Sequence, residues 1–170
     1  MLEVIKNRHS CRSFKDQVVE DEKIEQIVEA GLYAPTGKNT QETICLVIKN
    51  KEKRDLLAKV NVSIMGREGD PFYGAPVVLV VFGSSRSFKD LDGGAMVENM
   101  LLEAEHLGLG TCWIHRAYES FLDDSVKEAF KDSGIDFDQY YGVANIALGY
   151  SNEKEIRKKI IKENRVFWVK

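Results

Sequence analysis

The chain has 170 residues and a mass of 19.3 kDa, which suits a single domain, 1–170, with a substantial core. It is 44% hydrophobic and 30% charged with a formal net charge of -3, which is typical of a globular protein and argues against a basic surface that binds nucleic acid. No apolar run is long enough to span a membrane, and the N-terminal residues lack the apolar stretch of a signal peptide, so we expect a cytoplasmic protein.

The first distinctive segment, residues 7–14, reads Asn-Arg-His-Ser-Cys-Arg-Ser-Phe and follows a short apolar run. Its two guanidinium groups, its imidazole and its hydroxyls are donors of the kind that bind a phosphate. The alternative is a solvated basic end of a helix, because Arg and Lys favour helix C-termini. The segment is therefore a candidate anion site in which Arg8, Ser10 and Arg12 are the main donors.

The segment after this cluster predicts a helix followed by a polar loop. Acidic residues at 20–22 precede apolar residues at helical spacing, and we expect the helix to run to about Ala34, because Pro35 and Gly37 end it. Residues 34–41 are small and polar, so they let a backbone approach a ligand closely. An ordinary connection between a helix and a strand is the alternative.

The middle of the chain alternates apolar strands and helices. Residues 44–48 predict a strand, 51–60 a charged helix, 61–73 a loop that lies over a pocket, and 77–82 a strand covered on both faces. Asp92 is the expected N-cap of a mostly apolar helix over 95–107, which Gly108 ends. Strands are predicted at 109–114 and 143–148, with a helix at 122–130 between them.

These elements predict an α/β or α+β domain of three layers with a mixed sheet. His115 and Arg116 follow a strand, where a loop can present backbone amides to a ligand. The basic tail at 154–165 is expected to be mostly solvated. The apolar end at 166–169 is expected to add a strand to a sheet, either its own or a partner's.

No metal site and no nucleophile with its base is predicted. The sequence contains no His-x-x-x-His pattern and no Gly-x-Ser-x-Gly elbow. Cys11, Cys45 and Cys112 are odd in number and widely spaced, so we expect three free thiols. We expect Cys45 and Cys112 in the core, whereas Cys11 lies among cations that favour a reactive thiolate only if the thiol is exposed.

Four segments, in order, resemble the nitroreductase family of FMN-dependent oxidoreductases. Residues 8–14 are similar to that family's Arg-Arg/His-Ser-x-Arg-x-Phe signature, and 34–41 resemble its Ala-Pro-Ser-x-x-Asn-x-Gln loop. Residues 70–81 resemble the segment that leads into a central strand, and 107–114 resemble Leu-Gly-Leu-Gly-x-x-Trp-Ile. The resemblance spans nearly the whole chain.

The resemblance implies an α+β, three-layer fold in which two subunits intertwine and FMN lies at the homodimer interface. One subunit would bind FMN through Arg8, His9, Ser10 and Arg12, with Arg12 near the polar edge of the flavin ring. The other would contribute Pro35, Thr36, Gly37 and Asn39. The backbone of Ile114 and His115 would approach the flavin N5 atom, and Lys162, with Lys159 or Arg165 as a substitute, would complete the phosphate site.

The implied function is transfer of electrons from NADH or NADPH to nitro compounds, quinones or similar acceptors by a ping-pong mechanism. Alternatives are a flavin-dependent dehalogenase or flavin-degrading enzyme on the same scaffold, a flavin-binding redox sensor or carrier, and a general phosphate binder. The chain departs from the family at His115-Arg116, where many members have Glu-Gly, and at Glu42-Thr43, where Pro-Trp is common. No substrate preference follows from the sequence.

Overall fold

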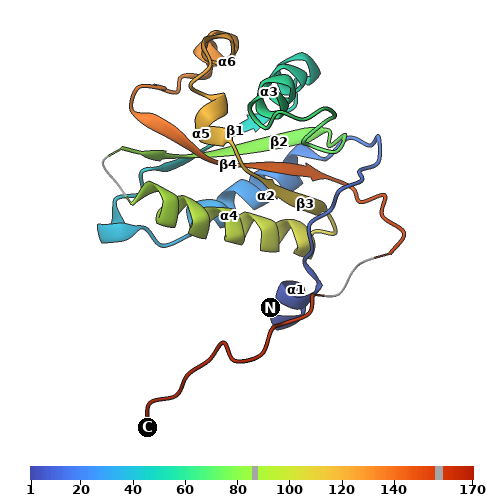
Figure 1. The fold of residues 1–170 in the computed structure, drawn as a ribbon, viewed down its shortest axis with the longest axis vertical. Helices are drawn as coiled ribbons and strands as arrows, with labels where there is room; N and C mark the ends of the chain where they lie inside the picture. Colours follow the sequence, from blue (N-terminus) through green and yellow to red (C-terminus); the bar gives the residue numbers. More distant parts are fainter. Residues whose placement is uncertain (86–87, 156–158) are drawn as a thin grey trace.

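The computed structural model describes residues 1–85, 88–155 and 159–170. Its centre is a four-stranded sheet in the order β1-β2-β4-β3, built from antiparallel pairs (Figure 1). The strands are β1 (Thr43–Ile48), β2 (Val77–Ser84), β3 (Gly110–Ile114) and β4 (Tyr140–Gly149). A mixed sheet was predicted. In the described residues, parallel pairing is limited to an isolated bridge between Ser10 and Thr111 at the β3 edge.

Helices cover both faces of this sheet and make the three layers that the sequence predicts (Figure 1). One face carries α2 (Asp21–Leu32) and α4 (Lys89–His106), and α1 (Leu2–Asn7) lies against α4. The other face carries α3 (Lys51–Ile64), α5 (Ala117–Ser120) and α6 (Asp124–Phe130). Two short 3₁₀ helices, η1 (Gly37–Asn39) and η2 (Lys131–Ser133), lie in connections. The chain therefore has an α+β fold with a helical layer on each side of the sheet.

Strand β2 explains why two separate cores form. All of its residues are buried, and successive side chains point to opposite faces. Val78, Val80 and Phe82 pack with α3, α5 and α6, whereas Leu79 and Val81 pack with α2 and α4. This confirms the prediction that the strand is covered on both faces.

Three predicted helix boundaries are wrong. Helix α4 begins at Lys89, so Asp92 lies inside the helix and is not its N-cap. The Asp92 carboxylate instead accepts a hydrogen bond from the Gly37 backbone amide. Helix α3 continues to Ile64, so the predicted loop starts four residues later than expected. The single helix predicted at 122–130 is replaced by α5 and α6, since Asp123 caps a new helix by accepting a hydrogen bond from the Ser125 amide (2.9 Å).

The C-terminal residues extend away from the body (Figure 1). Phe167 and Trp168 are 87% and 81% exposed, and no strand pairing of 166–169 occurs within the described residues. Two residues of the predicted basic tail, Arg157 and Lys158, lie outside the described residues. Pairing of this end with a partner stays a prediction. No helix in the described ranges is both long and apolar enough to cross a membrane.

Helix α4 approaches β4 closely at Gly93. A methyl group there would lie 2.8 Å from a methyl carbon of Val143, and the stiff β-branched side chain cannot move aside easily. At the next residue, Gly94, a methyl group would come no closer than 3.9 Å to Trp113. Both glycines therefore lie inside the same helix, but only Gly94 has room for a methyl group.

We expect Gly93→Ala to destabilise the fold by about 1–3 kcal/mol through overpacking. The matched variant Gly94→Ala should be neutral or stabilising by up to about 1 kcal/mol, because alanine favours a helix more than glycine does. Thermal and denaturant unfolding measure both. Equal effects of the two substitutions would contradict the close approach of α4 to β4.

Candidate functional site

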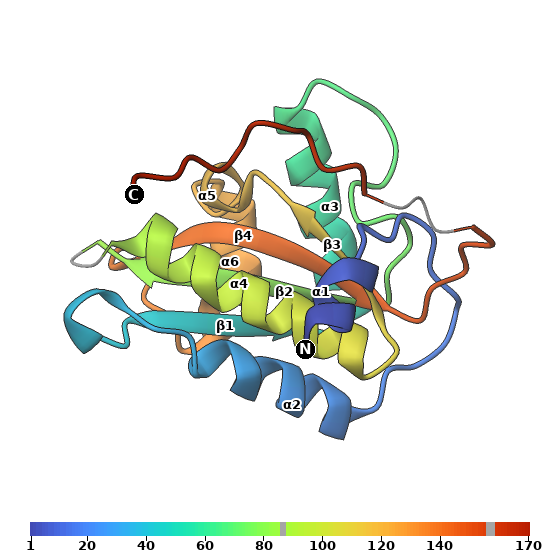
Figure 2. The ribbon, with the colours of Figure 1, turned by 90° about the horizontal axis from the view of Figure 1, so that it is seen from below.

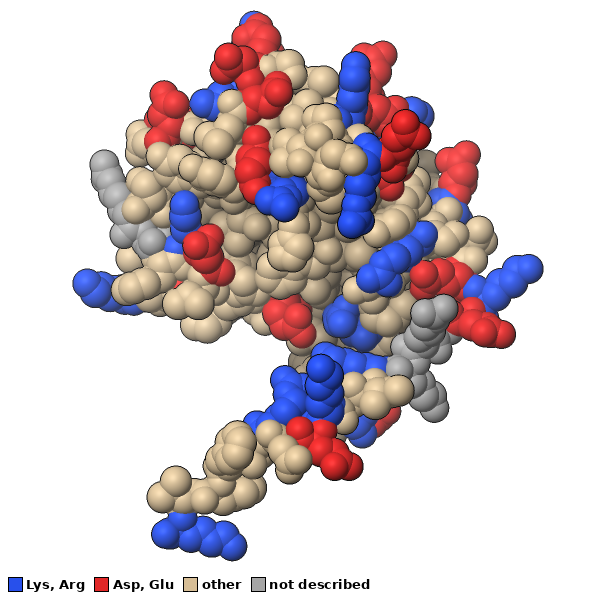
Figure 3. Space-filling view, viewed as in Figure 1, with Lys and Arg blue, Asp and Glu red and all other residues tan. Residues whose placement is uncertain are grey.

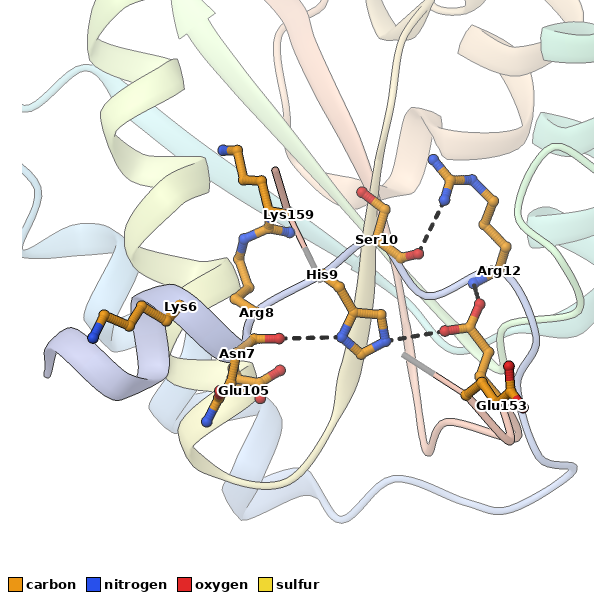
Figure 4. Close-up of a pocket in the computed structure, with 10 residues that line it drawn as sticks. Lys6, Asn7, Arg8, His9, Ser10, Arg12, Glu105, Glu153 and Lys159 are labelled. Carbon is orange, nitrogen blue, oxygen red and sulfur yellow. Dashed lines mark hydrogen bonds and ion pairs between the residues drawn. The ribbon is translucent and has the colours of Figure 1, made fainter. Parts of the chain in front are cut away.

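A cavity of about 790 Å³ lies beside the segment that the sequence singles out as an anion site (Figure 4). It is formed where the residues after α1, the C-terminal end of α4 and the residues after β4 meet. The lining residues are Lys6, Asn7, Arg8, His9, Ser10, Arg12, Glu105, Glu153, Glu155 and Lys159. The structure thus brings together all four residues predicted from the N-terminal segment.

The N-terminal segment is fixed against the edge of β3. The Cys11 amide donates to the Thr111 carbonyl (2.8 Å), and the Cys11 side chain is fully buried against Gly110. Any side chain at Gly110 would collide, since a Cβ there would lie 2.8 Å from the Cys11 sulfur. Because Cys11 points inward, its neighbours Ser10 and Arg12 are left to line the cavity.

Glu153 ties this segment to the chain that follows β4. Its carboxylate accepts hydrogen bonds from the Arg12 backbone amide (2.9 Å) and from His9 Nε2 (3.0 Å). His9 Nδ1 lies 3.3 Å from the Asn7 carbonyl oxygen, so the ring lies between two acceptors, as Figure 4 shows. The Glu153 carboxylate therefore holds both the His9 ring and the Arg12 backbone.

The cavity has cationic groups available for an anion. The Arg12 guanidinium donates to the Ser10 carbonyl (3.2 Å), whereas the Arg8 guanidinium has no carboxylate partner within the described part of the chain. Figure 3 shows Lys and Arg side chains gathered where the tail leaves the body. Lys6, Arg8, Arg12 and Lys159 outnumber the three glutamates of the cavity, and this donor set fits a dianionic phosphate.

Of the three tail cations named as candidates, Lys159, Lys162 and Arg165, the structure places one beside the first cavity. Lys159 lines the cavity. Lys162 and Arg165 are exposed and are not among the residues that line either cavity described here. Among the described residues of the tail, Lys159 is the cation that lines this cavity within one chain.

The second predicted group, Pro35, Thr36, Gly37 and Asn39, forms a tight loop at the N-terminal end of α4. The Gly37 amide donates to Asp92 Oδ1 (2.9 Å), and the Thr36 hydroxyl accepts from the Gln41 amide (3.0 Å). Asp92 is only 6% exposed, and its other carboxylate oxygen has no partner among the described residues. Asp92 therefore holds the loop. This role is not evident from the sequence, where Asp92 is assigned as the N-cap of the helix.

The two predicted groups are far apart within one chain. Glu105 lines the first cavity at one end of α4, and Asp92 holds the loop at the other end. Glu105 follows Asp92 by thirteen positions along the α-helix, which corresponds to roughly 20 Å. Within one chain the two predicted groups therefore lie at opposite ends of α4.

A second cavity, of about 590 Å³, opens at the C-terminal end of β3, between the ends of α3 and α4. It is lined by Ile64, Met65, Arg67, Asp90, His115, Arg116, Ala117, Tyr118, Glu119, Gly142 and Val143. The Arg116 guanidinium pairs with Glu119 (2.5 Å), and this hydrogen bond is the main cause that lowers the pKa of Glu119. The Ile114 side chain packs in the core, so at this position only the backbone is available to a ligand.

The three thiols are free, as predicted. Cys11 is fully buried and Cys112 is 3% exposed. Burial raises the pKa of Cys45 to about 12 and also raises the pKa of Cys112. A reactive Cys11 is therefore not supported, because its cationic neighbours act on a thiol that reagents do not reach.

Comparisons with known proteins agree with the resemblance. The model of the nitroreductase family matches residues 5–71 and 66–150. The chain is 30% identical to two archaeal proteins, from Methanothermobacter thermautotrophicus and Archaeoglobus fulgidus, that are each named "Putative NADH dehydrogenase/NAD(P)H nitroreductase". Each alignment covers 66% of this chain and 59% or 66% of the relative, so the chain spans less than two thirds of either relative's length.

Solved structures share nearly the whole fold. A nitroreductase with bound FMN from Bacteroides fragilis superposes with a TM-score of 0.90 at 24% identity, over 99% of this chain and 98% of that chain. A nitroreductase with bound FMN from Desulfitobacterium hafniense gives a TM-score of 0.86 at 27% identity, over 99% and 97%. At 24% identity, the Bacteroides fragilis structure shows a shared fold alone. The Desulfitobacterium hafniense structure shares the fold at a slightly higher identity of 27%.

We expect iodoacetamide at pH 8 to leave all three thiols of the native protein unmodified. With a pKa of about 12, only about one Cys45 thiol in ten thousand is ionised at that pH. Mass spectrometry after alkylation in guanidinium chloride, where three modified thiols are expected, provides the control. Rapid native modification of Cys11 would show that the segment does not stay packed against β3.

Proposed function

Because the chain belongs to the nitroreductase family, we propose that it is an FMN-dependent oxidoreductase that acts as a homodimer and takes electrons from NADH or NADPH. The observation that supports this best is the separation of the two predicted groups along α4. Each group has the chemistry of a partial cofactor site, and a second copy of the chain can bring the group around Arg8 to the loop around Gly37. The 1–170 chain would supply both halves as one domain.

The first cavity fits the phosphate end of FMN. Arg8 has no carboxylate partner in the described residues, and Ser10 and Lys159 line the same space, so these groups can meet the dianion directly. Glu153 holds His9 and the Arg12 backbone in place, which keeps the segment ordered. Lys162 and Arg165 are exposed and line neither cavity of their own chain, so we assign them to the phosphate site of the partner subunit.

The face that carries α1, α2 and α4 fits a second copy of the chain. Figure 2 looks onto this face. Its exposed large apolar residues are Leu2, Ile5, Leu32, Tyr33, Phe88 and Leu91. Phe88 packs on Gly37, in the loop at 34–41, and is still 59% exposed, and Leu91 is 75% exposed. Burial of this surface and of the apolar tail end in a dimer removes both from water.

The roles of individual residues follow from the chemistry of a flavin. When bound, FMN supplies two-electron chemistry that the side chains of the chain lack. Arg12 would place positive charge at the polar edge of the ring, where negative charge develops on reduction. The peptide after His115 would face N5, and the second cavity would admit first a nicotinamide and then an acceptor such as a nitro compound or a quinone, in ping-pong order.

The decisive test is the visible spectrum of the purified protein, followed by steady-state oxidation of NADH and NADPH with a nitroaromatic or quinone acceptor. We expect FMN absorbance, bleaching by the nicotinamide without oxygen, and parallel lines in double-reciprocal plots. A bound flavin that nicotinamide does not reduce would support the redox sensor or carrier instead. A colourless protein that does not take up FMN would support the general phosphate binder.

We expect Arg8→Ala to weaken FMN binding by about 10- to 100-fold, because a charge-assisted hydrogen bond contributes about 1.5–3 kcal/mol. The control is Lys131→Ala, since Lys131 is an exposed cation on η2 that pairs with Glu128 (2.5 Å). Fluorescence titration of the FMN-free proteins measures both. Unchanged affinity in the Arg8 variant would remove this residue from the site.

Deletion of residues 166–170 should weaken the dimer if the apolar tail end packs on the partner. The control is Leu122→Ser, which removes an exposed apolar side chain from the connection between α5 and α6, on the other side of the sheet. Sedimentation velocity over a range of concentrations measures the dimer dissociation constant. A truncated protein that dimerises as tightly as the full chain would contradict the role of the tail.

A further inference from the structure

We propose that Asn61 and Asn145 are positioning residues that hold the His115–Arg116 peptide so that the Arg116 N–H faces the bound flavin ring at N5. The inference rests on the proposed function, because that proposal places the ring beside this peptide. It adds the two side chains that set the direction of the N–H.

Both asparagines donate to the same carbonyl oxygen. Asn61 Nδ2, from α3, lies 2.9 Å from the His115 oxygen, and Asn145 Nδ2, from β4, lies 3.2 Å from it. Both side chains are fully buried, and Asn61 also contacts the Ser120 hydroxyl at 3.4 Å. The two elements belong to different layers of the fold, so their convergence on one backbone atom fixes that atom from two directions.

The orientation of both amides is dictated by this carbonyl. A carbonyl oxygen only accepts, so each amide must turn its nitrogen toward it and its own oxygen away. As a result, the Oδ1 atoms of Asn61 and Asn145 are buried without a partner among the described residues. A buried acceptor without a partner is unfavourable, and apolar side chains would avoid that penalty. The pair is thus explained by the orientation of the peptide better than by the stability of the core.

The direction of the N–H follows from peptide geometry. In the described chain every peptide is trans, so the Arg116 N–H points opposite to the His115 carbonyl, away from Asn61 and Asn145. Arg116 has a φ of 71°, which is rare for a residue with a side chain and requires the surroundings to maintain it. The Arg116 amide has no hydrogen-bond partner in the described residues, so it is available to a ligand acceptor.

The acceptor that suits this N–H is a ring nitrogen with a lone pair. His115 and Arg116 line the second cavity, which lies at the C-terminal end of β3. The bridge between Ser10 and Thr111 lies at the opposite end of the same strand. Oxidised flavin presents such a lone pair at N5. The same amide, turned by rotation of the peptide, would point into the core and leave N5 without a donor.

The test uses three variants and a matched control in full-length protein loaded with ¹⁵N-labelled FMN. Asn61→Leu and Asn145→Leu each remove one donor, and the double variant removes both. The control is Asn99→Leu, because Asn99 Nδ2 also donates to a backbone carbonyl, that of Ala30 (3.0 Å), but between α4 and α2. FMN affinity, the unfolding temperature and the ¹⁵N resonance of N5 are measured for each.

We expect the N5 resonance of the double variant to move to higher frequency, since a nitrogen of this type is deshielded when its lone pair loses a donor, while the N3 resonance stays in place. Affinity for FMN should fall about fivefold for each asparagine removed, the effect of one net hydrogen bond. The Asn99 variant should keep the wild-type resonance and affinity.

The outcomes separate the two proposals. Wild-type protein that takes up no FMN overturns the proposed function and this inference together. Wild-type protein that binds FMN, with an unchanged N5 resonance in the folded double variant, overturns only the positioning role. Single variants that keep one donor but cannot be obtained folded also overturn that role, because the pair would then serve the fold.

Discussion

The 18-residue helix α4 is the constraint on which the functional arrangement depends, because it holds two groups of polar residues roughly 20 Å apart. At its C-terminal end, Glu105 borders the cavity that contains Arg8 and Arg12. At its N-terminal end, Asp92 holds the loop around Gly37. A packed helix keeps this separation, so the shared site proposed above takes one group from each of two chains. The exposed apolar face along α1, α2 and α4 is consistent with such an assembly.

Strand β3 provides the second organising element. Ser10 forms a β-bridge with Thr111 near the start of β3, and the His115–Arg116 peptide follows the end of β3. The strand therefore connects the cationic cavity to the second cavity. Polar side chains fix the backbone at each end: partly buried Glu153 holds the N-terminal segment, and fully buried Asn61 and Asn145 hold the peptide. The predicted cofactor contacts are thus mostly backbone groups and cations that other residues orient.

The sequence predicted what depends on local pattern. The β2 strand is an unbroken apolar run, and the donors of residues 8–12 are adjacent in the chain, so both could be recognised without the fold. Glu153 could not, because it lies 141 residues from Arg12 and resembles the other acidic residues of the tail. Asp92 was misassigned because an Asp before two glycines has the pattern of a helix cap. Asn145 gave no signal, since a single polar residue in a buried strand does not reveal which carbonyl it contacts.

The most direct measurement of a site shared between two subunits is complementation in a purified heterodimer. One subunit carries Arg8→Ala, and the other carries alanine at Pro35, Thr36 and Asn39, so each homodimer has two damaged sites. If each site takes its two halves from different subunits, both substitutions fall in the same site of the heterodimer and the other site is intact. The heterodimer is then predicted to bind one FMN with wild-type affinity. A heterodimer that binds FMN no better than the two parent homodimers would contradict the shared site.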